Sequence, residues 1–198
     1  MKKIAQRACL VAGLALTLPG CFFVVGAAAG AAAIAVVYDH RTIANTLEDT
    51  DLANQISDKI QAIPGLHNDC HIEVTAFHRV VLLSGETPNT TWRQQAEEIA
   101  RSVPGVRRIY NQLTIQGPTS SLTRTSDSWI TTKIKSTMLA TENLKSSSIK
   151  VITENGTVYL MGIVTMEQAN TAVNIAREVS GVQKVVKIFQ YRPAPAQE

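Results

Sequence analysis

Three potential metal ligands, His67, Cys70 and His71, stand within five consecutive residues. Zinc binds imidazole and thiolate well, but structural zinc sites usually take four ligands in two closely spaced pairs. This chain has no Cys-x-x-Cys pair and no second half to the cluster. Residues 143–148, which correspond to this loop in a second copy of the same unit described below, contain neither histidine nor cysteine. The spacing therefore predicts no metal site, and we expect a loop that carries a free thiol.

No other group of residues has the spacing of a catalytic centre. The sequence lacks a recognisable arrangement of serine, histidine and aspartate, and no glycine-rich loop follows a predicted strand to cradle a phosphate. The matched carboxylates lie on helix faces that we expect to be solvated. The sequence therefore predicts a non-enzymatic protein without a cofactor, and an exported enzyme is the least favoured class.

Cys21 is the residue with the clearest covalent chemistry. Basic residues lie near the start of the chain, residues 8–18 are mainly apolar, and Leu18-Pro19-Gly20 leads directly to Cys21. A charged start, a short apolar segment and a small residue before a cleavage point are typical of a secretory signal peptide. The cysteine makes the motif resemble a bacterial lipobox, in which it is acylated and becomes the new N-terminus. The alternative is an ordinary export signal with a chance cysteine. An aspartate after the cysteine would favour the inner membrane, so Phe22 favours the outer membrane, facing the periplasm.

The charge of the chain gives no argument for a nucleic-acid partner. The sequence has 19 lysines and arginines against 16 aspartates and glutamates, and the three basic residues of the signal segment account for the difference. Residues 21–121 carry seven basic and ten acidic side chains, whereas residues 122–198 carry nine and six. The positive second half predicts a negatively charged partner. Without Cys9, and with Cys21 acylated, only Cys70 would remain, so we expect no intramolecular disulfide.

Residues 22–38 form an uncharged run centred on a stretch of glycine and alanine. A membrane-spanning helix needs about 20 apolar residues, and this run is shorter and weakly hydrophobic in its middle. We favour a small-residue tether lying close to the bilayer over a membrane-inserted segment. Residues 39–50 are expected to form a polar leader.

The rest of the chain contains two copies of one unit. Ile72–Gly85 aligns with Ile149–Gly162 at an offset of 77, and Ile99–Val106 aligns with Ile175–Val182 at an offset of 76. Each copy has the periodicity of a helix, two strands joined by a tight turn, a second helix and a final strand. The Asn-Gly pair in the second copy is the favoured pair of a type I′ turn.

These patterns predict an α/β (α+β) fold of two tandem α-β-β-α-β modules, each a three-stranded sheet packed on two helices. Trp92 lies on the apolar stripe of a predicted second helix, so we expect it in the core. The first helix carries its apolar stripe at Leu52, Ile56, Ile60 and Ile63 in the first copy and at Ile130, Ile134 and Met138 in the second. The predicted segments are a signal peptide (1–20), a lipidated N-terminus and tether (21–50), the first module (51–116), a linker (117–125), the second module (126–191) and a tail (192–198).

The second copy resembles the BON domain family, named for bacterial osmotic-shock and nodulation proteins. The likeness is most detailed over residues 126–139, 145–151 and 153–162, and it extends over residues 39–191 as two modules behind the lipobox-like motif. The resemblance implies that the first helix of the second module binds anionic phospholipid. It also implies a role in outer-membrane integrity, with recruitment to division sites.

The first helix of the second copy has an outward face unlike that of the first. At about 100° per residue, Trp129 and Leu139 point away from the apolar stripe, whereas the equivalent residues of the first copy, Asp51 and Gln61, are polar. An outward tryptophan beside lysines suits the interface of an anionic bilayer. The alternative is that Trp129 packs against the first module. The predicted phospholipid-binding residues are Trp129, Leu139, Thr132, Lys133, Lys135 and Ser136.

The sequence therefore predicts a lipid-anchored outer-membrane protein, facing the periplasm, that binds a phosphatidylglycerol-like anionic phospholipid. The rival hypothesis is a scaffold that uses the same helix face to bind envelope-assembly proteins. Nucleic acid is not an expected partner, since the basic residues are scattered and export removes the protein from DNA.

Overall fold

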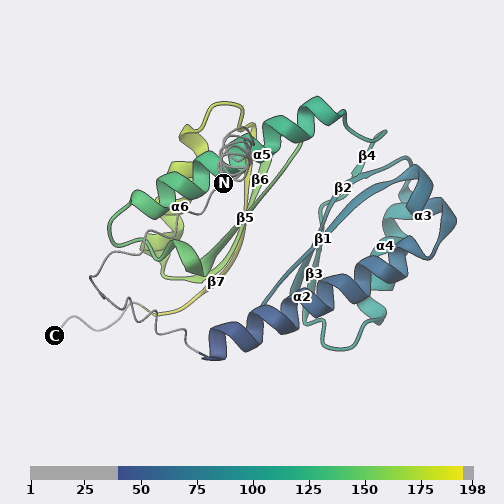
Figure 1. Cartoon of the computed structure of the whole chain (residues 1–198), viewed down its shortest axis with the longest axis horizontal. Coiled ribbons are helices and arrows are strands. Elements are labelled where there is room, and N and C mark those ends of the chain that lie inside the picture. The colour runs from purple at the N-terminus through teal and green to yellow at the C-terminus, as the bar shows by residue number, and fades with distance from the viewer. Residues whose placement is uncertain (1–39, 194–198) are drawn as a thin grey trace, which may run out of the picture. The chain divides into compact units, whose positions relative to one another are not determined.

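The structure, a computed structural model, describes residues 40–193, with side chains from residue 45 onward (Figure 1). The predicted signal peptide, the acylated Cys21 and the tether at 22–38 lie outside the described residues. Both copies of the repeat belong to one compact unit.

The first module contains three helices and a small sheet. Helices α2 (His40–Gln61) and α3 (Pro64–Asp69) precede the strands β1 (His71–Phe77) and β2 (Val80–Thr87). Helix α4 (Thr90–Ser102) is followed by β3 (Arg108–Asn111) and β4 (Thr114–Ile115). Strand β2 pairs antiparallel with β1 and parallel with both β3 and β4. The predicted last strand is thus interrupted, with Gln112 and Leu113 between its two parts.

The second module repeats this order with a continuous last strand. Helix α5 (Ser121–Ala140) and a short 3-10 turn, η1 (Ser146–Ser148), lead to β5 (Ile149–Glu154) and β6 (Thr157–Val164). Helix α6 (Met166–Glu178) and β7 (Lys184–Tyr191) complete it. Strand β6 pairs antiparallel with β5 and parallel with β7. The predicted α-β-β-α-β order is confirmed in both modules.

Helices α2 and α5 begin earlier than their apolar stripes predict. Helix α2 starts at His40, within the predicted polar leader, and α5 starts at Ser121, within the predicted linker. The added turns are mostly polar and lack a repeating apolar stripe, so hydrophobic periodicity does not reveal them. Helix α3 was also not predicted. It starts at a proline in the first helical position and buries Leu66, which a six-residue helix can do without a visible period.

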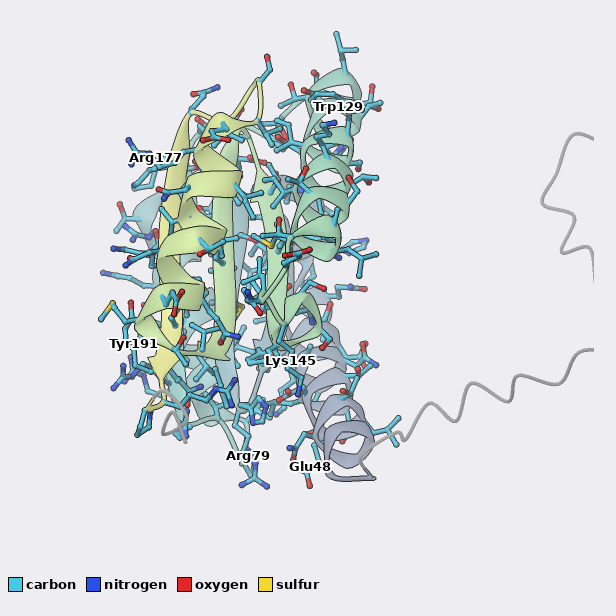
Figure 2. The ribbon with its side chains drawn as sticks, turned by 90° about the vertical axis from the view of Figure 1, so that its left-hand side faces the viewer. Glu48, Arg79, Trp129, Lys145, Arg177 and Tyr191 are labelled. Carbon is cyan, nitrogen blue, oxygen red and sulfur yellow. The ribbon has the colours of Figure 1, made fainter. Side chains whose placement is uncertain are left out.

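In each module, an aspartate of the first helix accepts hydrogen bonds from the hairpin turn between the first two strands. The Asp49 carboxylate accepts the backbone N–H groups of His78 at 2.7 Å and Arg79 at 2.9 Å. The equivalent Asp127 accepts those of the Asn155-Gly156 turn at 2.7 and 2.9 Å. All four turn residues have positive φ, between 48° and 71°, as a type I′ turn requires. A carboxylate that takes both N–H groups makes two charge-assisted hydrogen bonds. Glu48 adds an exposed ion pair with Arg79 at 3.3 Å, and both are labelled in Figure 2.

The described residues form three hydrophobic cores. One lies between the first sheet and its helices, and a second lies between the other sheet and its helices. Figure 1 shows α2 and α4 beside the first sheet and α5 and α6 beside the second. The third core joins the two sheets and is built from Val80, Leu82, Tyr159, Met161 and Ile188. Strands β2 and β6 are therefore covered on both faces, which explains their unbroken apolar runs.

Candidate functional site

Helix α5 divides its side chains into a buried and an exposed side. The Ser120 hydroxyl caps the start of the helix by accepting the Thr123 backbone N–H at 3.2 Å. Ile130, Ile134 and Met138 are buried in the second core. Because these residues follow one another at helical spacing, α5 packs along this side and leaves the other side to solvent.

The exposed side of α5 carries three large apolar residues. Trp129, labelled in Figure 2, is 55% exposed, Leu139 is 77% exposed and Leu122 is 79% exposed. The predicted outward orientation of Trp129 and Leu139 is confirmed, and the alternative that Trp129 is buried against the first module is wrong. Leu122 was missed because it falls in the predicted linker. It precedes Trp129 by seven residues, about two turns, which puts both on one side of the helix.

The polar residues predicted to accompany Trp129 are also exposed. Lys133 and Lys135 form no ion pair within the part of the chain that the structure describes. The Thr132 hydroxyl donates to the Ser128 carbonyl oxygen and the Ser136 hydroxyl donates to the Lys133 carbonyl oxygen, both at 2.9 Å. The hydroxyl donors are thus satisfied by the helix itself, while the two ammonium groups are available to an external anion.

The equivalent face of α2 has the opposite character. Asp51 and Gln61 replace Trp129 and Leu139, and the Gln55 amide donates to the Asp51 carboxylate at 2.8 Å. Among the residues of α2 with described side chains, Leu47 is the one large apolar residue that is exposed. The tryptophan-bearing face is therefore a property of the second module and not of the repeat.

Trp92 behaves as the sequence predicts. It is partly buried and packs on the first core. A Cβ atom added to Gly65 would lie 2.2 Å from its ring, so the absence of a side chain at Gly65 is what allows α3 to cover the indole.

The structure does not bring His67, Cys70 and His71 together as one group of ligands. The Cys70 thiol lies 3.9 Å from the Gly65 carbonyl oxygen, and burial raises the pKa of the thiol. In the described residues, His71 instead clusters with Glu86 and Glu154. Sequence reasoning did not find this group because its members lie on three strands of two modules.

His71 and Glu154 also line a cleft of about 490 Å³ formed by β1, β5 and the first half of α5. Arg124 and Asp127 of α5 contribute charged side chains to its wall. Burial, and next the neighbouring Glu86, raise the pKa of the Glu154 carboxyl to about 7. The cleft is therefore a second place at which charge is concentrated, separate from the outward face of α5.

Residues 48–117 and 126–193 each match the BON domain, and the chain belongs to the BON-domain family. It is a protein with two such domains, of a family whose members are non-enzymatic.

The chain is similar to several bacterial proteins. Over 191 residues, 96% of both chains, the sequence is 35% identical to the outer membrane lipoprotein DolP of Haemophilus influenzae. It is also 35% identical over 153 residues to a 21 kDa hemolysin of Actinobacillus pleuropneumoniae, covering 77% of this chain and 79% of that protein. The osmotically-inducible protein Y of Escherichia coli is 31% identical over 117 residues, 58% of each chain. The similarity to DolP extends over both modules and the segment before them, and it supports an outer-membrane lipoprotein with BON domains.

None of the helices in the described part of the chain is long and apolar enough to cross a membrane.

Proposed function

We propose that this protein is held in the outer membrane by acylation of Cys21, faces the periplasm, and binds anionic phospholipid through the exposed face of α5. The observation that carries the proposal is the contrast between the two first helices. Trp129 and Leu139 are exposed on α5 beside Lys133 and Lys135, whereas the same face of α2 is polar.

The chemistry of this face suits the headgroup region of a bilayer. An indole ring prefers that depth because it combines an apolar body with a polar N–H group. Each lysine near an anionic surface contributes about 1 kcal/mol. The Thr132 and Ser136 hydroxyls already donate to backbone carbonyls, which lowers the cost of moving them out of water.

The lipid anchor and the helix have different tasks in this proposal. Two or more acyl chains hold a protein at a membrane durably, so α5 is not needed for residence. The helix instead selects among lipids and orients the module. A DolP-like protein that reads anionic lipid would gather where such lipid is enriched, and we propose division sites and the maintenance of outer-membrane integrity as its setting.

Vesicle binding tests the proposal directly. Residues 38–198 contain every residue of the three described cores, so this fragment can be sedimented with phosphatidylglycerol or phosphatidylcholine vesicles. We expect preference for the anionic vesicles, loss of binding at high salt, and roughly tenfold or greater weakening in Trp129→Glu, on the order of 1.4 kcal/mol or more.

Leu139→Glu and Gln61→Glu form a matched pair for the same assay. Both introduce one exposed carboxylate at equivalent positions of the two modules, and only Leu139→Glu is expected to reduce binding. Equal binding to both lipids, or full binding by Trp129→Glu with an unchanged melting temperature, would refute the proposal. Either result would favour the rival function, a scaffold whose α5 face docks an envelope-assembly protein.

A further inference from the structure

A histidine and two glutamates meet where the two sheets face each other. His71 starts β1 and is the direct cross-strand partner of Glu86 on β2. Glu154 ends β5 and comes from the second module. One potential ligand atom from each of the three lies within 4.8 Å of the others, and His71 Nε2 is 3.8 Å from Glu154 Oε1.

Strand alternation explains why these polar side chains are buried. Side chains two residues apart lie on the same face of a strand, so Glu86 shares the face of Val80 and Leu82, and Glu154 shares the face of Ile152. All three of these apolar residues belong to the core between the sheets. The two carboxyl groups are therefore held at the edge of an apolar interface by the register of their own strands.

Both carboxyl groups have an oxygen without a hydrogen-bond partner among the described residues. Glu86 is fully buried; its Oε2 accepts the Thr119 backbone N–H at 3.3 Å, but its Oε1 accepts nothing. Glu154 is 9% exposed, and its Oε1 is also unpartnered. Buried polar atoms are almost always satisfied, and an unsatisfied pair of carboxylates is costly. Two buried carboxyl groups, each with an unpartnered oxygen, beside one imidazole form a set of potential metal ligands.

We propose that His71, Glu86 and Glu154 bind a divalent transition-metal ion, for which Zn²⁺ is the best match. One imidazole nitrogen and two carboxylate oxygens form a mixed set of the kind that zinc accepts, with water as the fourth ligand. The cleft of about 490 Å³ that His71 and Glu154 line provides an entry path and room for that water.

The geometry requires only a modest contraction. In a tetrahedral site with bonds of about 2.0–2.2 Å, ligand atoms are about 3.4 Å apart. The largest observed separation, 4.8 Å, exceeds this value by about 1.4 Å, a difference that rotation of the glutamate side chains about their χ angles can close.

The ion would link the two modules, because His71 and Glu86 belong to the first and Glu154 belongs to the second. The surrounding charge supports a cation. Glu73 and Asp127 line the same cleft as His71 and Glu154, and Arg124 is the one arginine or lysine among its lining residues. A bound dication would offset this excess of negative charge at the module interface.

Zinc binding to the full chain, purified in a non-denaturing detergent without a histidine tag and freed of metal with a chelator, tests the proposal. Competition with a chromophoric chelator should give one Zn²⁺ per chain. Glu154→Gln and Glu86→Gln should each weaken binding at least tenfold, since each removes one of three protein ligands.

Two controls separate this site from its neighbours. The double variant His67→Ala/Cys70→Ser removes the nearby loop ligands and should bind as the parent does. Glu73→Gln removes a carboxylate of the same cleft that is not a ligand, so it should weaken binding far less than Glu154→Gln does. Zn²⁺ should also raise the melting temperature of the parent and of these controls, but not that of Glu154→Gln.

Three results would overturn the proposal: less than one ion per chain in the parent, parent-like affinity in Glu154→Gln, or equal loss in the loop variant. If Glu86→Gln does not fold, Glu154→Gln decides alone, because it replaces a side chain at the cleft edge. None of these readouts involves lipid, so the result is independent of the α5 proposal.

Discussion

Replacing Glu154 by glutamine should make the metal-free protein more stable at alkaline pH and leave it almost unchanged in acid. The change keeps the size of the side chain and removes its charge. Burial and the neighbouring carboxylates raise the pKa of Glu154 from 4.5 to about 7 in the folded protein. The folded chain therefore binds a proton that the unfolded chain has already released between these two values.

The sign and size of the effect follow from this difference. A raised pKa in the folded state contributes stability that is complete below pH 4.5 and is lost as the pH rises through about 7. At about 1.36 kcal/mol per pH unit, the loss amounts to about 3 kcal/mol. Because water in the cleft reaches part of the carboxyl, we expect about 2 kcal/mol. The free energy of unfolding of Glu154→Gln should exceed that of the parent by this amount at pH about 8.5, with near equality at pH about 4.5.

Urea unfolding followed by circular dichroism, with a chelator present, measures this difference at the two pH values. Glu142→Gln is the matched control, since it removes the same charge from an exposed position. Its effect should be small and similar at both pH values. If Glu154→Gln is no more stable than the parent in alkaline buffer, or if its effect is the same at both pH values, then the carboxyl is not held in an unfavourable environment.

Four further substitutions test other parts of the structure. Asp127→Ala removes the acceptor of both N–H groups in the β5–β6 turn and should lower the free energy of unfolding in urea by about 3 kcal/mol. The equivalent Asp49→Ala should lower it by a similar amount. A negligible loss of stability in both variants would show that the turns form without their aspartates. Gly65→Ala places a Cβ atom 2.2 Å from the Trp92 ring and should lower the free energy of unfolding by about 1–3 kcal/mol. Tryptophan fluorescence should change as well, and an unchanged emission spectrum would contradict the close packing. Leu122→Glu should weaken binding to anionic vesicles while changing stability by no more than about 0.5 kcal/mol, and unimpaired vesicle binding would confine the lipid-binding face to the turns from Trp129 onward.

Local spacing was enough to predict the modules and the orientation of α5. The stripe of Ile130, Ile134 and Met138 is buried as the helical period requires, and Asn155-Gly156 forms the turn expected of that pair. Thr165 and Gln168 form a capping box at the start of α6. These features depend on residues within four positions of one another, so the sequence displays them directly.

The helix starts and the hairpin aspartates were not evident from the sequence. The first turns of α5 are polar apart from Leu122, so the sequence predicts a linker there. Asp49 and Asp127 are buried although each stands among polar residues on its helix, and their partners are turn residues about thirty positions later. A signal existed, since the two aspartates occupy equivalent positions in the repeat.

The sequence by itself determined that this chain holds two BON modules and that the second presents a tryptophan where the first presents an aspartate, because periodicity and repeat alignment are both read from the order of residues along the chain. Only the tertiary structure decided that the two sheets pack face to face. That packing covers both sides of β2 and β6 and brings His71, Glu86 and Glu154 within 4.8 Å of one another. The physical reason is that a strand's period fixes which face a side chain occupies, but not what that face meets when the chain folds.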